Sequence, residues 1–133
     1  MITRLSHVTV FVKNQDEALT FYTEVLGCEK RMDATLGGFR WLTVAPPRQK
    51  EVEMVLLSPT AMFDAATAAR FEALMKEGRV GGGVFCTDDC QGDYEKLTAR
   101  GVKFRGPPER KPFGLQATFY DNSNNWFSLT QPR

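Results

Sequence analysis

The chain contains a single histidine, His7, in the middle of the first predicted strand, residues 2–12. An imidazole has an ordinary pKa of about 6.5, so it can transfer protons near neutral pH or bind a divalent metal. Alternation along a strand places His7, Thr9 and Phe11 on one face and the intervening valines on the other. We expect the valine face to pack on the core and His7 to point to the opposite face. One histidine excludes every site that needs two.

Composition limits the class of protein. The 133 residues are 42% hydrophobic, with 17 basic against 16 acidic side chains. This is enough for one domain with a real core, and the even charge balance argues against nucleic-acid binding. No apolar run approaches the roughly 18 residues of a membrane span, and we expect no membrane or signal segment. Three cysteines, Cys28, Cys86 and Cys90, argue against a disulfide framework, so we expect a cytoplasmic protein.

The predicted elements occur twice along the chain. In the first copy, Asn14 is a candidate helix cap with Glu17 three residues on, and Gly27 ends that helix. The predicted strands and helices of the two copies are 2–12, 14–27, 28–35, 39–45 and 51–57, then 80–87, 88–100, 102–105, 113–120 and 125–131. The glycines that end the two helices, Gly27 and Gly101, are 74 residues apart.

This repetition predicts the fold. We expect an α+β protein with two βαβββ repeats, about residues 1–58 and 79–133, joined by a helix within about 59–78, all in one domain, 1–133. The two curled sheets are expected to enclose a cleft, with helices on the outside.

Strand alternation then selects the residues that face the cleft. An aromatic and apolar wall with few polar groups is typical of a small-molecule site, although each ring alone is equally compatible with core packing. The facing of Trp41 is left open. The predicted ligand-binding residues are His7, Phe11, Glu53, Val55, Gly82, Trp126 and Ser128. The run Gly81–Gly83 is interpreted as making room in the cleft or allowing close approach of the backbone.

Several motifs occur in a characteristic order over nearly the whole chain. They are His7-Val8-Thr9-Val10-Phe11-Val12, Ala18-Leu19-Thr20-Phe21-Tyr22, Leu26-Gly27, Glu53-Met54-Val55-Leu56, Pro112-Phe113-Gly114 and Asp121-Asn122-Ser123-Asn124-Asn125. This order resembles the vicinal oxygen chelate superfamily of glyoxalases, bleomycin-resistance proteins and extradiol dioxygenases. The resemblance implies a small-molecule ligand, a homodimer and, in enzymatic members, a divalent metal held by the first and last strands of each repeat.

Carried over by position, the resemblance implies metal ligands at His7 and Glu53 and, 75 residues on, at Gly82 and Ser128. Glycine has no side chain and a neutral hydroxyl is a poor ligand, whereas catalytic zinc sites usually have three protein ligands. We therefore expect a small-molecule-binding protein without a tightly bound catalytic metal.

Alternatives stay open from the sequence alone. Glu51, Asp33 or Cys86 could complete a metal site, and His7 and Glu53 would then be the catalytic and metal-binding candidates of a lyase, isomerase or thiol transferase. Otherwise His7 is a pocket residue hydrogen-bonded to Glu53. A structural or regulatory dimer whose cleft is filled by side chains is the third reading.

Overall fold

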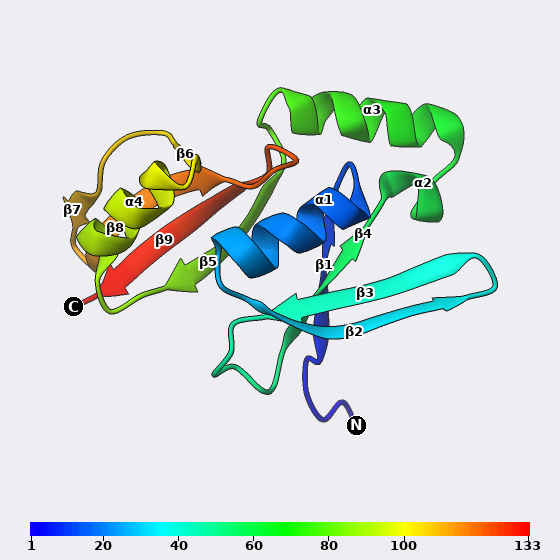
Figure 1. Ribbon diagram of the computed structural model, residues 1–133, viewed down its shortest axis with the longest axis horizontal. Helices are drawn as coiled ribbons and strands as arrows, with labels where there is room; N and C mark the ends of the chain where they lie inside the picture. The colour runs from blue at the N-terminus through cyan, green and yellow to red at the C-terminus, as the bar shows by residue number, and fades with distance from the viewer. The chain divides into compact units, whose positions relative to one another are not determined.

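The computed structural model describes residues 1–133 and divides into two compact units, residues 1–72 and 73–133. Each unit contains one mixed β-sheet, of four strands in the first and five in the second (Figure 1). The predicted α+β class is confirmed. No helix has both the length and the apolar character required to cross a membrane.

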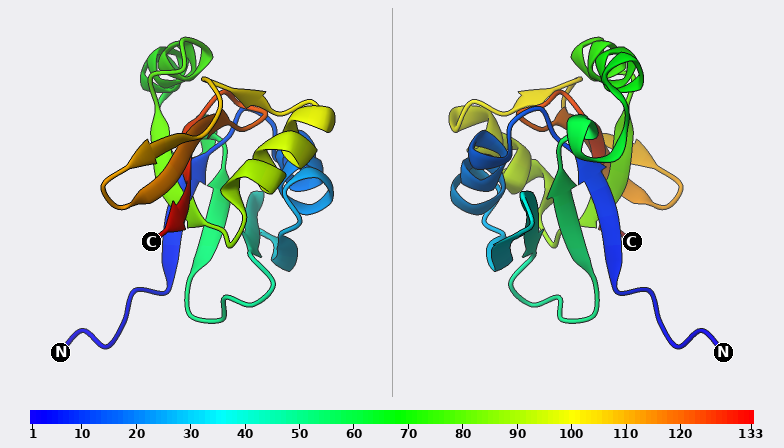
Figure 2. Two further views of the ribbon diagram at one scale, coloured as in Figure 1. Left: turned by 90° about the vertical axis from the view of Figure 1, so that its left-hand side faces the viewer. Right: turned by 90° about the vertical axis from the view of Figure 1, so that its right-hand side faces the viewer.

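The first unit is a sheet of strand order β1-β4-β3-β2, in which β1 is parallel to β4 and the other pairs are antiparallel. Its elements are β1 (His7–Phe11), α1 (Gln15–Thr20), the π-helical turn η1 (Phe21–Val25), β2 (Glu29–Leu36), β3 (Phe39–Ala45), β4 (Glu53–Leu57) and α2 (Pro59–Met62). Figure 2 shows α1 on one side of this sheet.

Local sequence explains the boundaries of the continuous helical segment formed by α1 and η1. The Asn14 side chain accepts a hydrogen bond from the Glu17 backbone N–H at 2.9 Å, which caps the first turn as predicted. Gly27 has a φ of 82°, a left-handed conformation that favours glycine after the helix ends. On the inner side of the helix, Ala18 and Tyr22 are fully buried and form part of the core.

The second unit has the strand order β5-β9-β8-β6, with β7 pairing to β8. Helix α3 (Ala65–Lys76) leads into it, followed by β5 (Gly81–Cys86), α4 (Cys90–Ala99), β6 (Lys103–Phe104), β7 (Glu109–Lys111), β8 (Gly114–Tyr120) and β9 (Trp126–Pro132). Helix α4 packs on the sheet, where Phe85, Phe119 and Phe127 stack on one another with centroids 5.1–6.0 Å apart. This aromatic cluster is the core of the second unit.

Three elements differ from the prediction. The single helix expected between the repeats is broken near Phe63, because Asp64 accepts a hydrogen bond from the Thr67 N–H at 2.8 Å and starts α3 afresh. Strand β1 begins only at His7, because its neighbour β4 begins at Glu53 and gives the preceding residues no strand to pair with. Strand β7, a short hairpin partner of β8, lacks a hydrophobic pattern and is absent from the prediction.

Candidate functional site

His7 and Glu53 lie side by side on the first sheet. Strands β1 and β4 are parallel and their register pairs these two residues, so both side chains point to the same face. The distance from His7 Nε2 to Glu53 Oε1 is 3.7 Å, and the two side chains are 36% and 27% exposed. His7 Nδ1 is 2.9 Å from the Ser6 hydroxyl. The imidazole is therefore held between a hydroxyl and a carboxylate, while part of it stays accessible to a ligand.

A third side chain anchors the carboxylate. Thr43 on β3 is fully buried and donates a hydrogen bond from Oγ1 to Glu53 Oε1 at 2.7 Å. Thr43 lies opposite Val55, so its bond to Glu53 runs diagonally across the strand pair. Sequence reasoning missed Thr43, although alternation along 39–45 would have placed it once the facing of this strand was known.

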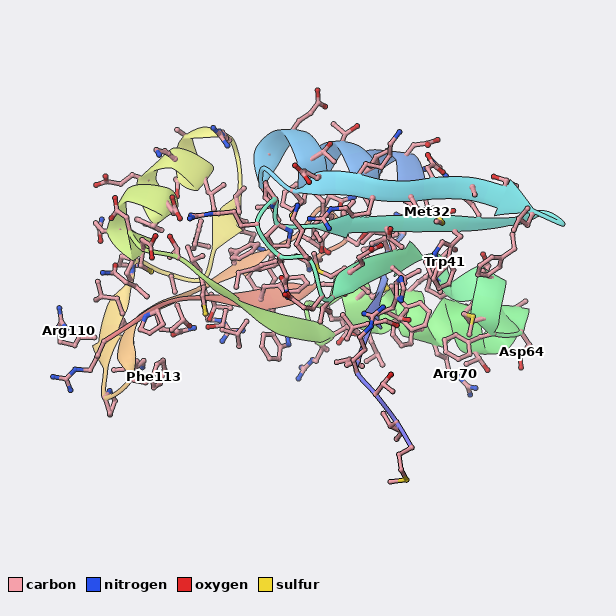
Figure 3. The ribbon with its side chains drawn as sticks, turned by 90° about the horizontal axis from the view of Figure 1, so that it is seen from below. Met32, Trp41, Asp64, Arg70, Arg110 and Phe113 are labelled. Carbon is pink, nitrogen blue, oxygen red and sulfur yellow. The ribbon has the colours of Figure 1, made fainter.

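Trp41 has the same facing. Its indole meets the His7 ring edge-on with centroids 5.4 Å apart. Phe39 lies on the same strand as Trp41, and the centroids of these two rings are 6.4 Å apart. Met32 on β2 pairs with Thr43 and is 51% exposed, so it extends this face; Figure 3 shows Met32 and Trp41 on neighbouring strands. The His7–Glu53 pair is therefore bordered by aromatic and apolar side chains.

Two predicted ligand contacts of this unit are packed more closely than expected. Phe11 is in ring contact with Phe63 and Phe71, at 5.4 and 4.8 Å, so the α2–α3 segment covers its ring. Val55 is only 1% exposed. Both residues have the predicted facing, but in the structure their side chains contribute to packing.

In the second unit, Ser128 occupies the strand position that corresponds to Glu53. Its hydroxyl accepts a hydrogen bond from Gln116 Nε2 at 3.1 Å and lies 2.9 Å from the Thr130 hydroxyl. Gln116 pairs with Thr130, so its bond to Ser128 follows the same diagonal as the bond from Thr43 to Glu53. The two units thus share a hydrogen-bond pattern, but the charged acceptor of the first is neutral in the second.

The counterpart of His7 differs from the sequence prediction. A constant spacing along the chain maps His7 to Gly82, but the register places Val84 opposite Ser128. The register shifts between Gly81 and Val84, as in a β-bulge, where an extra residue enters one strand. The side chain at this point of the second unit is therefore an apolar valine.

The bulge also explains the glycine run. A Cβ on Gly82 would lie 1.7 Å from the Trp126 carbonyl oxygen, and one on Gly81 would lie 1.8 Å from the Trp126 indole. Gly82 requires glycine because the backbone of β9 approaches it directly, whereas Gly81 leaves space for the Trp126 indole. At Gly82, the contacts support close backbone approach, one of the two sequence interpretations.

The residues present do not fit a divalent-metal centre. No group of three His, Cys, Asp or Glu side chains comes together. Asp33, one of the suggested extra ligands, pairs with Leu42 on the other face of the sheet and accepts two 2.9 Å hydrogen bonds from Arg40. That guanidinium lowers the pKa of Asp33 below its usual range. His7 and Glu53 are left as a two-residue set, and catalytic zinc usually takes three protein ligands.

Comparison with known proteins identifies the family. The model of the Glyoxalase/Bleomycin resistance protein/Dioxygenase superfamily matches residues 4–129. The chain belongs to this superfamily. The resemblance inferred from the sequence motifs is thereby confirmed.

Three similar proteins illustrate the match. The uncharacterized protein YurT of Bacillus subtilis strain 168 is 31% identical over 123 residues, which cover 92% of this chain and 94% of YurT. UcmS2, known from a crystal structure, is 47% identical in sequence to this chain. The match covers 98% of each chain, and the two structures superpose with a TM-score of 0.93. TnmS3, described as an antibiotic binding protein from Streptomyces sp. CB03234, is 32% identical with a TM-score of 0.79, over 99% of this chain and 98% of TnmS3.

Proposed function

We propose that this superfamily member binds a small apolar or aromatic molecule and does so without a tightly bound catalytic metal. The observation that carries the proposal is the first-unit face, where Trp41, Phe39 and Met32 border the single pair of His7 and Glu53. Small-molecule sites are typically apolar and aromatic, with a few polar groups that orient the ligand. His7 and Glu53 are suited to that orienting role.

The comparisons support the same class of function. TnmS3 is described as an antibiotic binding protein and is 32% identical to this chain over nearly its whole length. A binding protein needs no metal, which agrees with the two-residue ligating set of the first unit and with Ser128 and Val84 in the second. We therefore propose antibiotics and aromatic metabolites as the first compounds to test.

The experiment is a thermal-unfolding screen of the purified protein against such a panel. A ligand specific for the folded state stabilises it by about 2.7 kcal/mol at one hundred times its Kd, which gives a clear rise in Tm. We expect W41F to weaken binding, whereas M62A, on an exposed residue of α2, should leave binding unchanged. A panel in which no compound raises Tm would contradict the proposal.

The metal-free part of the proposal has its own test. The alternative, a metal-dependent lyase, isomerase or thiol transferase using His7 and Glu53, draws on the 3.7 Å separation of these side chains. Elemental analysis of protein purified without chelator distinguishes the two functions. Stoichiometric divalent metal in the wild type that is absent from H7A would contradict the metal-free binding function and support the enzymatic one.

We also propose that the chain acts as a cytoplasmic homodimer, as the resemblance implies. The cytoplasmic assignment is supported by the three cysteines, all of which are free thiols. Light scattering on the eluting protein tests the dimer, and a monomeric mass at micromolar concentration would contradict it.

A further inference from the structure

We propose that the face of β8 and β9 opposite the aromatic cluster binds the polar group of an uncharged aromatic ligand through a neutral ladder, formed by the half-buried Gln116, Thr118 and Ser128 and the buried Thr130. The inference rests on the proposed function and specifies the chemistry of the ligand. It concerns residues of the second unit alone, of which only Ser128 is among the ligand-binding residues predicted from the sequence.

The ladder is continuous. Gln116 Nε2 donates to Thr118 Oγ1 at 3.0 Å and to Ser128 Oγ at 3.1 Å, and it is 3.1 Å from the Ala117 carbonyl. Ser128 Oγ and Thr130 Oγ1 are 2.9 Å apart. The antiparallel register pairs Gln116 with Thr130 and Thr118 with Ser128, so all four side chains share one face. These contacts hold the polar atoms in place before a ligand arrives.

The internal bonds leave a defined set of groups for a ligand. Both amide protons of Gln116 are engaged, but its Oε1 has no partner in the chain and is free to accept. Thr118 accepts from Gln116, which leaves its hydroxyl proton to donate. Of the two hydroxyl protons of Ser128 and Thr130, one forms the hydrogen bond between their oxygens, and the other is left to donate to a ligand. The ladder therefore offers one acceptor and two donors, all without charge.

An aromatic surface lies beside these groups. Trp126 precedes Ser128 by two residues on β9 and so has the same facing, and its indole lies against Gly81, where no side chain intervenes. Tyr120 pairs with Trp126 across the sheet. A ligand ring in contact with the indole would place a hydroxyl or carbonyl substituent close to the ladder.

Comparison with the first unit indicates why the ligand group should be neutral. The corresponding diagonal bond there ends on the Glu53 carboxylate, with His7 alongside, whereas here it ends on Ser128 with Val84 opposite. A charged group placed on the four ladder side chains would lose hydration and gain hydrogen bonds to uncharged groups, which is unfavourable. A phenol or carbonyl would exchange its hydrogen bonds to water for hydrogen bonds to the ladder.

Two cations lie beside β8 and define the competing outcome: Lys103 pairs with Tyr120, and the Arg105 backbone N–H donates to the Thr118 carbonyl at 2.8 Å. Lys103 and Arg105 are exposed and lie over the Tyr120 ring, at 5.2 and 6.0 Å from its centroid, and Arg105 Nε donates to the Tyr120 hydroxyl at 3.3 Å. If these cations governed binding, an anionic aromatic compound would be preferred.

Three probes with the same ring system separate these possibilities: 2-naphthol, naphthalene and naphthalene-2-sulfonate. Their affinities are measured by quenching of tryptophan fluorescence in wild type, Q116L and T118V. The matched control is Q91L, the same substitution at an exposed glutamine on α4. We expect 2-naphthol to bind about tenfold more tightly than naphthalene, the effect of one or two neutral hydrogen bonds. This ratio should fall toward one in Q116L and T118V and stay unchanged in Q91L.

Each contrary outcome has a separate meaning. Equal binding of naphthalene and 2-naphthol would overturn the ladder while leaving the proposed function intact. Tightest binding of the sulfonate, lost in R105Q, would overturn it in favour of the cations. If no probe binds, the inference fails, and the thermal screen decides the proposed function independently. Thr118 is only half-buried, so T118V carries the test should Q116L fail to fold.

Discussion

Replacing Gly82 by alanine should separate β5 from β9 at the bulge. The new Cβ would lie 1.7 Å from the Trp126 carbonyl oxygen and 3.3 Å from the Phe127 ring. Non-bonded heavy atoms are most favourably about 3.5–4 Å apart, so the first contact is far inside the repulsive range. The obstructing atom belongs to the backbone, and no side-chain rotation can relieve the clash.

The magnitude follows from what must move. The Trp126 N–H donates to the Val80 carbonyl at 3.0 Å, next to the bulge, and this bond is the first to be lost if β5 shifts outward. A lost hydrogen bond costs about 1 kcal/mol and an overpacked position costs about 1–3 kcal/mol. We expect G82A to lower the free energy of unfolding by about 2–4 kcal/mol.

The adjacent residue provides the control. A Cβ on Gly83 would meet no atom within 4 Å, so G83A should shift stability by less than about 1 kcal/mol, toward greater stability, because alanine restricts the unfolded chain. Urea unfolding followed by far-ultraviolet circular dichroism measures both variants. A wild-type midpoint for G82A, or equal losses in G82A and G83A, would refute the bulge as the reason for the glycine run.

Three further predictions concern stability and reactivity. Arg40 lowers the pKa of Asp33, so this ion pair stabilises the fold fully above the ordinary carboxyl pKa of about 3.9, and the stabilisation is lost as pH falls through the lower pKa of the folded state. We expect D33N to flatten the decline of the urea midpoint below about pH 5, and an unchanged decline would contradict this. Iodoacetamide should modify the exposed Cys86 far faster than Cys28, because burial raises the pKa of the Cys28 thiol to about 11. Mass spectrometry after labelling of the native protein locates the label, and equal labelling of the two cysteines would be the contrary result. The Asp89 side chain caps α4 by accepting from the Gly92 N–H at 2.9 Å, so D89A should lower the free energy of unfolding by about 1 kcal/mol, measured by urea unfolding, and no loss would argue against the cap.

Much of the fold was predictable because its signals are local. The Asn14 cap and the left-handed Gly27 depend on residues within one helical turn, and the same holds for the hairpin at Gly37 and Gly38, whose φ angles are both positive. Alternation along β1 gave the facing of His7, and the family motifs gave Glu53 as its neighbour. The 3.7 Å contact between these side chains agrees with that placement.

The amino-acid sequence by itself determined which side chains share a face within an uninterrupted stretch of strand, because the period of two is a property of the backbone alone. Only the tertiary structure decided which strands' side chains meet. It brought Trp41 and Thr43 to the His7–Glu53 pair, and it placed Val84 rather than Gly82 opposite Ser128. The physical reason is that register is set between strands, by pairing and packing, so one extra residue in a bulge changes every cross-strand neighbour without altering any pattern along the chain.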